Sequence, residues 1–334
     1  KLSIYIYVGG EKKILLFYPF GATKHYGDSI KNELIKKGAY VVGYDERPSQ
    51  HPIVKAVIRV LKKKVPTLFS AYIKKIIRNN RDFNFDYILV LRGEAFTAET
   101  VSLLKTAYKN AKLILYLWDI LKSTKLEDVI PFFDKALSFD PDDVKNNSGL
   151  ILRPTFFMPQ YEMLKKHAIK KYDIVFIGTL HSNRYQTLQI LKDYLEKNSL
   201  SYLFYLYVPS KLAYIKNKYL DGIPVNEEEI HYDPISLDKT LDIIANTKCI
   251  LDLNFTGQKS LSMRAFESMI SKTKYITTNP EIKSYDFYSE KNILLIDIND
   301  ITIPNEFINS PFEDVPYSIL EKYSVRQLVD DLLS

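Results

Sequence analysis

The sequence contains a single cysteine, Cys249, among its 334 residues. An internal disulfide and a cysteine-ligated zinc site are therefore excluded, and we expect a reducing compartment. No apolar run approaches the ~18–20 residues of a membrane-spanning helix, and the first residues hold too short an apolar core for a secretory signal. These absences predict a cytoplasmic protein.

Glycine is also scarce, with 11 residues in the whole chain. No G-x-G-x-x-G follows any of the expected strands, and there is no phosphate-binding P-loop motif. These absences argue against an NAD-dependent dehydrogenase and against an ATPase.

Apolar runs alternate with helical patterns from the start of the chain. Lys13–Tyr18 and Ala39–Tyr44 read as strands on either side of a helix over Ser29–Lys37, which is a βαβ unit. Further strands and helices of the same kind are expected at Asp86–Leu91, Ala98–Tyr108, Lys112–Leu117, Tyr172–Ile177, Ser182–Lys197, Tyr202–Val208, Leu237–Asn246, Cys249–Leu253, Tyr275–Thr277 and Asn292–Ile296. Continuous apolar strands are typical of parallel sheets that are covered on both faces.

The pattern stops once and then restarts, which predicts an α/β protein with two Rossmann-like domains facing across a cleft. Prolines and a polar run over Ser138–Tyr161 have the composition of a linker. We place an N-terminal domain at 1–155, a second domain at 156–316 and a helical segment at 317–334. Its final helix, Val325–Leu333, is expected to pack back on the N-terminal domain.

Two places could bind an anion. A helix that starts near Ser260 would align Ser260, Arg264 and Glu267 in one stripe, with free N–H groups at its start. Such a stripe suits a nucleotide diphosphate with its ribose, but an Arg264–Glu267 pair on a solvated face fits equally well. The second place is Gly178 to Arg184, where a strand ends before a helix and an arginine could reach a phosphate.

The chain resembles GT-B glycosyltransferases, closest to the CgeB-like and lipopolysaccharide or capsule biosynthesis proteins. The resemblance rests on Asp173–Arg184, on Met263–Met269 before Tyr275–Asn279, and on Tyr285–Tyr288. Looser likeness in the first half covers Tyr44–Pro48, Leu91–Gly93, Tyr116–Asp119 and Leu152–Pro154. The resemblance implies a nucleotide-sugar donor in the second domain and a glycan or lipid-linked acceptor in the first.

The resemblance also implies roles for single residues. Glu267 would bind the donor ribose, as the second glutamate of the family's E-x7-E motif does, although Lys259 stands where the first glutamate belongs. The segment Glu229–Ile235, with Tyr232, would contact the nucleobase. The implied donor-nucleotide residues are Gly178, Thr179, Arg184, Tyr232, Ser260, Arg264 and Glu267.

A general base is expected in the first domain. His25 lies on the expected loop after the first strand, and its ordinary pKa suits proton removal from an acceptor hydroxyl. Asp28, Glu94 and Asp119 are alternatives, while His25 as a surface residue or Asp28 as a helix cap fits equally well. Asp140 to Asp143 resembles a metal motif, but its proline favours a turn. The resemblance implies no metal or other cofactor, because backbone dipoles and arginine stabilise the leaving diphosphate.

Residues 51–81 hold nine lysines and arginines and no acidic residue. The segment could contact an anionic membrane, form a solvated helix face, or bind nucleic acid, for which it has no known motif. We favour the membrane, with a contact surface of Lys55, Arg59, Lys62, Lys63 and Lys74. The sequence thus predicts a metal-independent glycosyltransferase for surface glycans, peripheral on the inner membrane face and not bound to nucleic acid. A nucleotide-sugar epimerase of the same fold and a non-catalytic membrane-associated scaffold are the alternatives.

Overall fold

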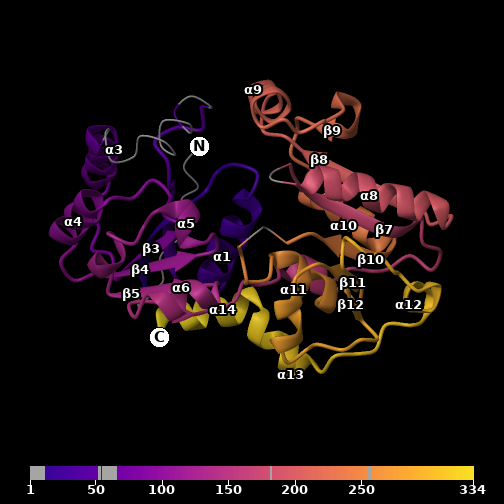
Figure 1. Cartoon of the computed structure of the whole chain (residues 1–334). Helices are drawn as coiled ribbons and strands as arrows, with labels where there is room; N and C mark the ends of the chain where they lie inside the picture. The colour runs from indigo at the N-terminus through magenta and orange to yellow at the C-terminus, as the bar shows by residue number, and fades with distance from the viewer. Residues whose placement is uncertain (1–11, 52–53, 55–65, 181–182, 255–256) are drawn as a thin grey trace. The chain divides into compact units, whose positions relative to one another are not determined.

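A computed structural model describes residues 12–51, 54, 66–180, 183–254 and 257–334 of the chain. The chain divides into two compact units (Figure 1), Lys1–Arg153 with Val329–Ser334 and Pro154–Leu328. Each unit is built on a six-stranded sheet in which all paired strands are parallel.

The sheet of the first unit has the strand order β2-β1-β3-β4-β5-β6. Its strands are β1 (Lys13–Tyr18), β2 (Tyr40–Asp45), β3 (Tyr87–Leu91), β4 (Lys112–Leu117), β5 (Lys135–Ser138) and β6 (Ile151–Leu152). Its helices are α1 (Lys24–Lys36), α3 (Pro66–Asn79), α4 (Ala98–Ala107), α5 (Leu121–Thr124), η2 (Ile130–Phe132) and α6 (Pro141–Asn146). Since β2 and β4 lie on opposite sides of the β1–β3 pair, right-handed crossovers place α1 and α4 on opposite faces of the sheet.

The sheet of the second unit has the order β12-β11-β10-β7-β8-β9. Its strands are β7 (Tyr172–Thr179), β8 (Tyr202–Tyr207), β9 (Ile230–His231), β10 (Thr247–Asp252), β11 (Lys274–Thr277) and β12 (Ile293–Leu295). Its longer helices are α8 (Arg184–Lys197), α9 (Lys211–Ile215), α10 (Leu237–Ala245), α11 (Met263–Ile270) and α12 (Asn305–Asn309). Its shorter elements are α7 (Pro159–Glu162), η3 (Lys216–Leu220), η4 (Glu227–Glu229), η5 (Pro280–Ser284), α13 (Tyr317–Leu320) and η6 (Glu321–Tyr323).

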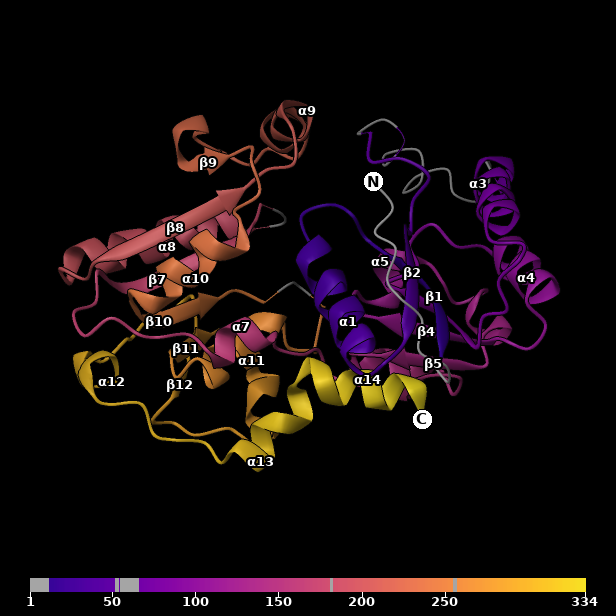
Figure 2. The ribbon, with the colours of Figure 1, turned by 180° about the vertical axis from the view of Figure 1, so that it is seen from behind.

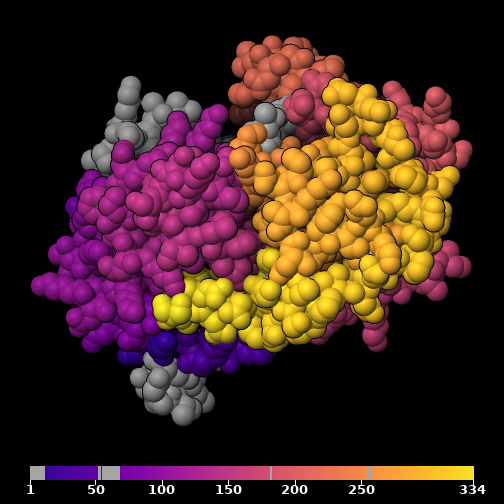
Figure 3. Space-filling view, turned by 60° about the horizontal axis from the view of Figure 1, so that its bottom comes forward, coloured from indigo at the N-terminus to yellow at the C-terminus, as the bar shows by residue number. Residues whose placement is uncertain are grey.

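The last helix, α14 (Val325–Leu333), begins in the second unit and ends in the first. Lys135 Nζ donates to the backbone oxygen of Asp331 at 2.6 Å, and Arg153 Nε forms an ion pair with the Asp331 carboxylate, also at 2.6 Å. Asp330 forms an ion pair with Lys37 at 2.7 Å. In Figures 2 and 3 the yellow end of the chain lies on the first unit. The C-terminal residues are therefore part of the N-terminal fold.

Several boundaries differ from the sequence predictions. Helix α1 begins at Lys24, so His25 and Asp28 lie on the helix and not on a loop. A glycine inside a helix usually disfavours it, but a Cβ at Gly27 would overlap the Tyr18 ring, so the ring packs where a side chain would stand. Asp28 is not the helix cap that the alternative interpretation required, because the N-cap of α1 is Thr23 and Asp28 lies within the helix, where it bonds Lys24 one turn earlier at 2.6 Å.

The other differences concern strand and helix ends. The expected linker over 138–161 contains α6 and β6, since tertiary pairing with β5 extends the sheet there. Strand β7 continues through Gly178 and Thr179, which pair with β8 and do not form a turn. Helix α8 begins at Arg184; Ser182, the expected cap, lies outside the described residues. Among the described residues, no helix is both long and apolar enough to cross a membrane.

Candidate functional site

Each sheet has one point where neighbouring strands connect in opposite directions, and open α/β sheets bind ligands outside the carboxyl ends of the strands at that point. In the second unit this point lies between β7 and β10, the two central strands of its sheet. In the first unit it lies between β1 and β3.

Arg184 joins the two central strands of the second unit at their carboxyl ends. Its Nη1 donates to Thr179 O at 2.8 Å, and its Nη2 donates to Leu253 O at 2.7 Å. The guanidinium also lies over the Phe176 ring, 5.4 Å from its centre. Burial lowers the pKa of Arg184, against the opposing charge of Asp252. Sequence reasoning placed this arginine near the edge but missed that backbone carbonyls hold it.

The loop before α11 lies at the same edge of the sheet. The helix begins at Met263, not near Ser260, because Ser262 is its N-cap and accepts from Arg264 N at 3.2 Å. Ser262 Oγ also donates to the Asp252 carboxylate at 2.7 Å, at the end of β10. Ser260 therefore lies on the loop, where its backbone oxygen accepts from Asn279 Nδ2 at 3.1 Å. Its side chain is buried.

Arg264, Glu267 and Tyr161 form a buried polar group under this loop. Arg264 Nη1 donates to Glu267 Oε2 at 2.6 Å and to Tyr161 OH at 3.0 Å. The Glu267 side chain is 0% exposed, whereas 18% of the Arg264 side chain reaches solvent. The Arg264–Glu267 pair at i, i+3 is present. The alternative interpretation that the pair lies on a solvated face is wrong. Of the two charged side chains, only Arg264 reaches solvent, and its guanidinium is bonded to the buried Glu267.

Tyr232 lies beyond β9, away from this group, and its OH donates to Glu227 at 2.8 Å. Beside it, the His231 ring stacks on Tyr205 with centroids 4.0 Å apart and planes 9° apart. The expected base-contacting segment, Glu229–Ile235, thus begins at the last residue of η4 and continues through the two-residue strand β9. His231 is exposed overall, but part of its ring is buried. This burial, together with the positive charge of Lys239, lowers the pKa of His231.

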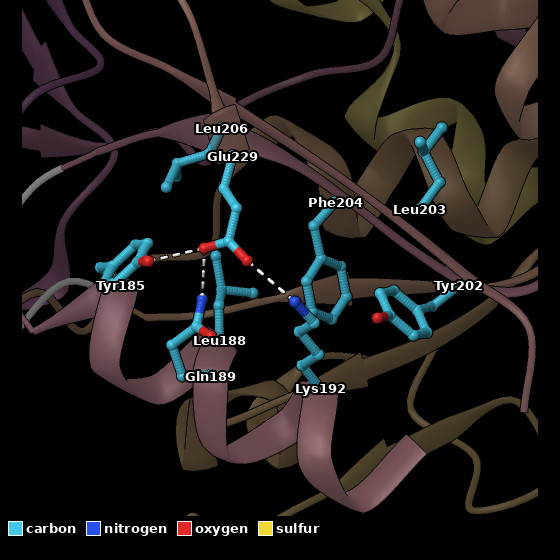
Figure 4. Close-up of a pocket in the computed structure, with 9 residues that line it drawn as sticks. All are labelled: Tyr185, Leu188, Gln189, Lys192, Tyr202, Leu203, Phe204, Leu206 and Glu229. Atoms are coloured by element: carbon cyan, nitrogen blue, oxygen red, sulfur yellow. Dashed lines mark hydrogen bonds and ion pairs between the residues drawn. The ribbon is translucent and has the colours of Figure 1, made fainter. Parts of the chain in front are cut away.

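A cavity of about 220 Å³ lies between α8 and β8. Figure 4 shows Glu229 at its wall, where Tyr185 OH (2.6 Å), Gln189 Nε2 (2.9 Å) and Lys192 Nζ (2.8 Å) bond its carboxylate. Three donors already satisfy the acid, and the cavity is below the ~300–1,000 Å³ of most ligand pockets. We therefore do not assign the donor to this cavity.

The carboxyl ends of β2, β3 and β4 in the first unit bring together five charged side chains. They are Glu46, Arg47, Arg92, Glu94 and Asp119. Both arginines bond Glu94, and Arg92 Nε lies 3.0 Å from Asp119 Oδ2 and 3.5 Å from Glu46 Oε1. The sequence predictions included Glu94 and Asp119, but missed Glu46 and both arginines. The available signal was that each lies just after an expected strand.

Within this cluster only the Asp119 carboxylate is substantially exposed, at 45% of its side chain. The Glu46 side chain is 0% exposed, and burial raises its pKa to about 7 against the lowering charges of Arg92 and Arg47. Arg92 has φ +69°, a left-handed conformation that is unusual for an arginine. Its N–H donates to Tyr116 O at 2.8 Å, which fixes the loop onto β4.

The remaining predicted residues lie at other places of the first unit. Tyr18 OH and Lys24 Nζ both bond the Asp28 carboxylate, at 2.9 and 2.6 Å, and the His25 ring lies 4.2 Å from that of Tyr26. Asp140 is the N-cap of α6, so the segment from Asp140 to Asp143 begins a helix and is not the turn that its proline favoured. Lys74 is exposed on α3. The other proposed membrane residues, Lys55, Arg59, Lys62 and Lys63, lie outside the described residues.

No protein-family model and no curated protein sequence matches the chain. Solved structures do match it, including the apo form of the lipopolysaccharide outer core galactosyltransferase WaaB, at 11% identity and TM-score 0.51 over 96% of this chain and 99% of that one. A glycosyltransferase from Rickettsia africae ESF-5 matches at 12% identity and TM-score 0.53, covering 97% and 94%. The Methanocaldococcus jannaschii UDP-GlcNAc 2-epimerase in complex with UDP-GlcNAc and UDP matches at 13% identity and TM-score 0.51, over 97% of this chain and 99% of that one.

These similarities establish the fold and nothing finer at such low identity. The two six-stranded parallel sheets with flanking helices form a GT-B fold of two Rossmann-like domains. The fold class predicted from the sequence is confirmed.

Proposed function

We propose that this protein is a glycosyltransferase that moves a sugar from a nucleotide-sugar donor to a glycan or lipid-linked acceptor of the cell surface, of the CgeB-like, lipopolysaccharide or capsule type. The observation that carries the proposal is the edge between β7 and β10. There, Arg184 joins the two strands, and the positive end of the α11 helix dipole, at its N-cap Ser262, would favour an anion. The donor diphosphate would bind at this edge.

In this proposal the second unit holds the donor through Gly178, Thr179, Ser260 and Arg264. Gly178 lies near the end of β7, where a Cβ would overlap the Phe176 ring and contact Arg184, so the glycine allows the packing of the Arg184 that would border the diphosphate. Glu267 acts as a positioning residue, because its buried carboxylate bonds Arg264 and has no exposed surface for a ribose. Tyr232, beyond β9, would lie beside the nucleobase.

The acceptor hydroxyl would lose its proton in the first unit. Asp119 suits this step because Arg92 fixes its carboxylate at 3.0 Å while 45% of its side chain remains open. Glu94 is already bonded by two arginines, and Asp28 by Lys24 and Tyr18. His25 remains the alternative base.

The proposal needs no metal, since arginine and backbone N–H groups would stabilise the leaving diphosphate. Among the described residues, no group of three or more His, Cys, Asp or Glu is placed to hold a metal ion. We also propose that the protein works at the cytoplasmic membrane face, where a lipid-linked acceptor would be found.

The test is a thermal-shift screen against UDP, GDP, CMP, dTDP and ADP with wild type, Arg264→Gln and Glu267→Gln. A nucleotide at ~100 times its Kd stabilises by about 2.7 kcal/mol, which is a shift of several degrees. We expect one nucleotide to stabilise wild type and to lose its effect on Arg264→Gln. Glu313→Gln removes an exposed carboxylate of the same unit and should behave as wild type. No shift with any nucleotide would favour a non-catalytic scaffold.

A nucleotide-sugar epimerase is the second candidate, because the archaeal epimerase shares the fold over the same length. The two functions differ in what they require. An epimerase converts UDP-GlcNAc without an acceptor, whereas a transferase releases nucleotide only when the acceptor takes the sugar. Conversion of the sugar with no acceptor present would replace the transferase proposal.

A further inference from the structure

The segment after β8 exposes an unusual number of apolar side chains. It forms helix α9 and the π-helix η3, which continue one another over residues 211–220. Four large apolar side chains are exposed there: Leu212 (68%), Ile215 (47%), Tyr219 (71%) and Leu220 (79%). No other ten-residue stretch of the described chain exposes as many. Figures 1 and 2 show α9 beyond the end of the strands of its own sheet.

The local sequence directs these side chains outward. Leu212 and Ile215, spaced i, i+3 in α9, lie on one face of that helix, and the exposed Tyr219 and Leu220 follow on the π-helix η3. Tyr214, between them, is buried in the core of the unit. The helix starts where Ser210 Oγ accepts from Ala213 N at 3.2 Å. The core therefore holds one side of the segment and leaves the apolar side without a partner within its own unit.

Charged residues border this apolar face. Residues 211–221 hold three lysines, Lys211, Lys216 and Lys218, and one acid, Asp221. Lys216 pairs with Asp221 at 2.6 Å, and Lys218 Nζ donates to Tyr214 OH at 2.9 Å. An apolar face bordered by lysines is typical of helices that lie in the interface of an anionic bilayer.

The size of the face also bears on its partner. A stable protein–protein interface uses ~20–30 residues a side, whereas this face consists of four large side chains on one short segment. Side chains that enter the bilayer interface need no such area, because each contributes by leaving water. The dimensions therefore favour a membrane over a second copy of the chain.

We propose that α9 and η3 form a membrane-contact segment that places Leu212, Ile215, Tyr219 and Leu220 in the interface of an anionic bilayer. This segment lies in the second unit and is separate from the basic residues 51–81. It would bring the donor-binding unit to the surface where a lipid-linked acceptor resides, and only this consequence rests on the proposed function. The contact itself does not depend on nucleotide binding.

The experiment is co-sedimentation of the full chain with vesicles of phosphatidylglycerol and phosphatidylcholine, and with vesicles of phosphatidylcholine alone. We expect binding to the anionic vesicles, and a loss of at least about tenfold in the variant Leu212→Asp/Leu220→Asp. Met163→Asp/Ile169→Asp is the matched control, since these side chains are 71% and 88% exposed in the same unit. Wild-type binding by the control variant is expected.

Two results would overturn the proposal. Undiminished vesicle binding by Leu212→Asp/Leu220→Asp would place the membrane contact elsewhere, with residues 51–81 as the next segment to test. A concentration-dependent wild-type dimer that this variant abolishes, without vesicle binding by either, would make the face a contact between copies. The nucleotide thermal shift of the same variant should remain that of wild type. It therefore separates failure of this proposal from failure of the donor site and checks that the variant folds.

Discussion

Glu46 offers a quantitative test of the buried charge cluster in the first unit. The cluster holds two arginines against three acids, so a proton on Glu46 leaves equal numbers of both signs. Burial raises the pKa of Glu46 from 4.5 to about 7. At 1.36 kcal/mol per pH unit, this difference corresponds to about 3 kcal/mol of folding free energy.

The sign follows from which state holds the proton. A raised pKa means that the folded protein binds the proton more tightly than the unfolded chain, so the contribution is complete below pH 4.5. It is lost as the pH rises through about 7. Between pH 5 and pH 8 the contribution should fall by about 2–3 kcal/mol.

The variant Glu46→Gln keeps the shape of the protonated acid and removes the titration. We therefore expect the stability of Glu46→Gln, relative to that of wild type, to rise by about 2–3 kcal/mol from pH 5 to pH 8. Urea unfolding followed by tryptophan fluorescence measures the stability of the first unit, because Trp118 is the only tryptophan of the chain and is buried there beside Asp119.

An exposed glutamate of the same unit provides the control. Glu99→Gln makes the same change of charge at an exposed position in the first turn of α4 and is the matched control. A difference between wild type and Glu46→Gln that is equal at pH 5 and pH 8 would refute the reasoning. It would mean that Arg92 and Arg47 keep Glu46 ionised throughout.

Four further predictions test the sites and the packing. Asp119→Asn should lower turnover about 10²–10⁴-fold with Trp118 fluorescence unchanged, whereas an equal loss in His25→Ala alone would make the histidine the base. Gly27→Ala should destabilise the first unit by about 1–3 kcal/mol in urea, because the new methyl overlaps the Tyr18 ring. Cys249, whose pKa burial raises to about 12, should react with a thiol reagent only as the second unit unfolds. Transferase activity should survive EDTA, and clear inhibition would contradict the metal-independent proposal.

The candidate sites show where sequence reasoning reached its limit. The i, i+3 spacing alone was enough to predict that Arg264 and Glu267 form a pair. It could not predict whether the pair is buried. That depends on Tyr161, more than 100 positions away, which packs under the helix. Likewise, Ser260 and Ser262 are equally good caps by composition. The choice of Ser262 follows from its bond to Asp252 at the end of a different strand.

The sequence by itself determined the two parallel sheets. A strand such as Lys112–Leu117 must be apolar along its length when helices cover both faces of its sheet. Such a strand can therefore be predicted from its own residues. The tertiary structure decided which charges meet. Glu46 and Asp119 follow strands far apart in the sequence, and only the strand order brings them to one arginine. Burial at that edge, which no local pattern encodes, then sets which carboxylate holds a proton and which faces solvent.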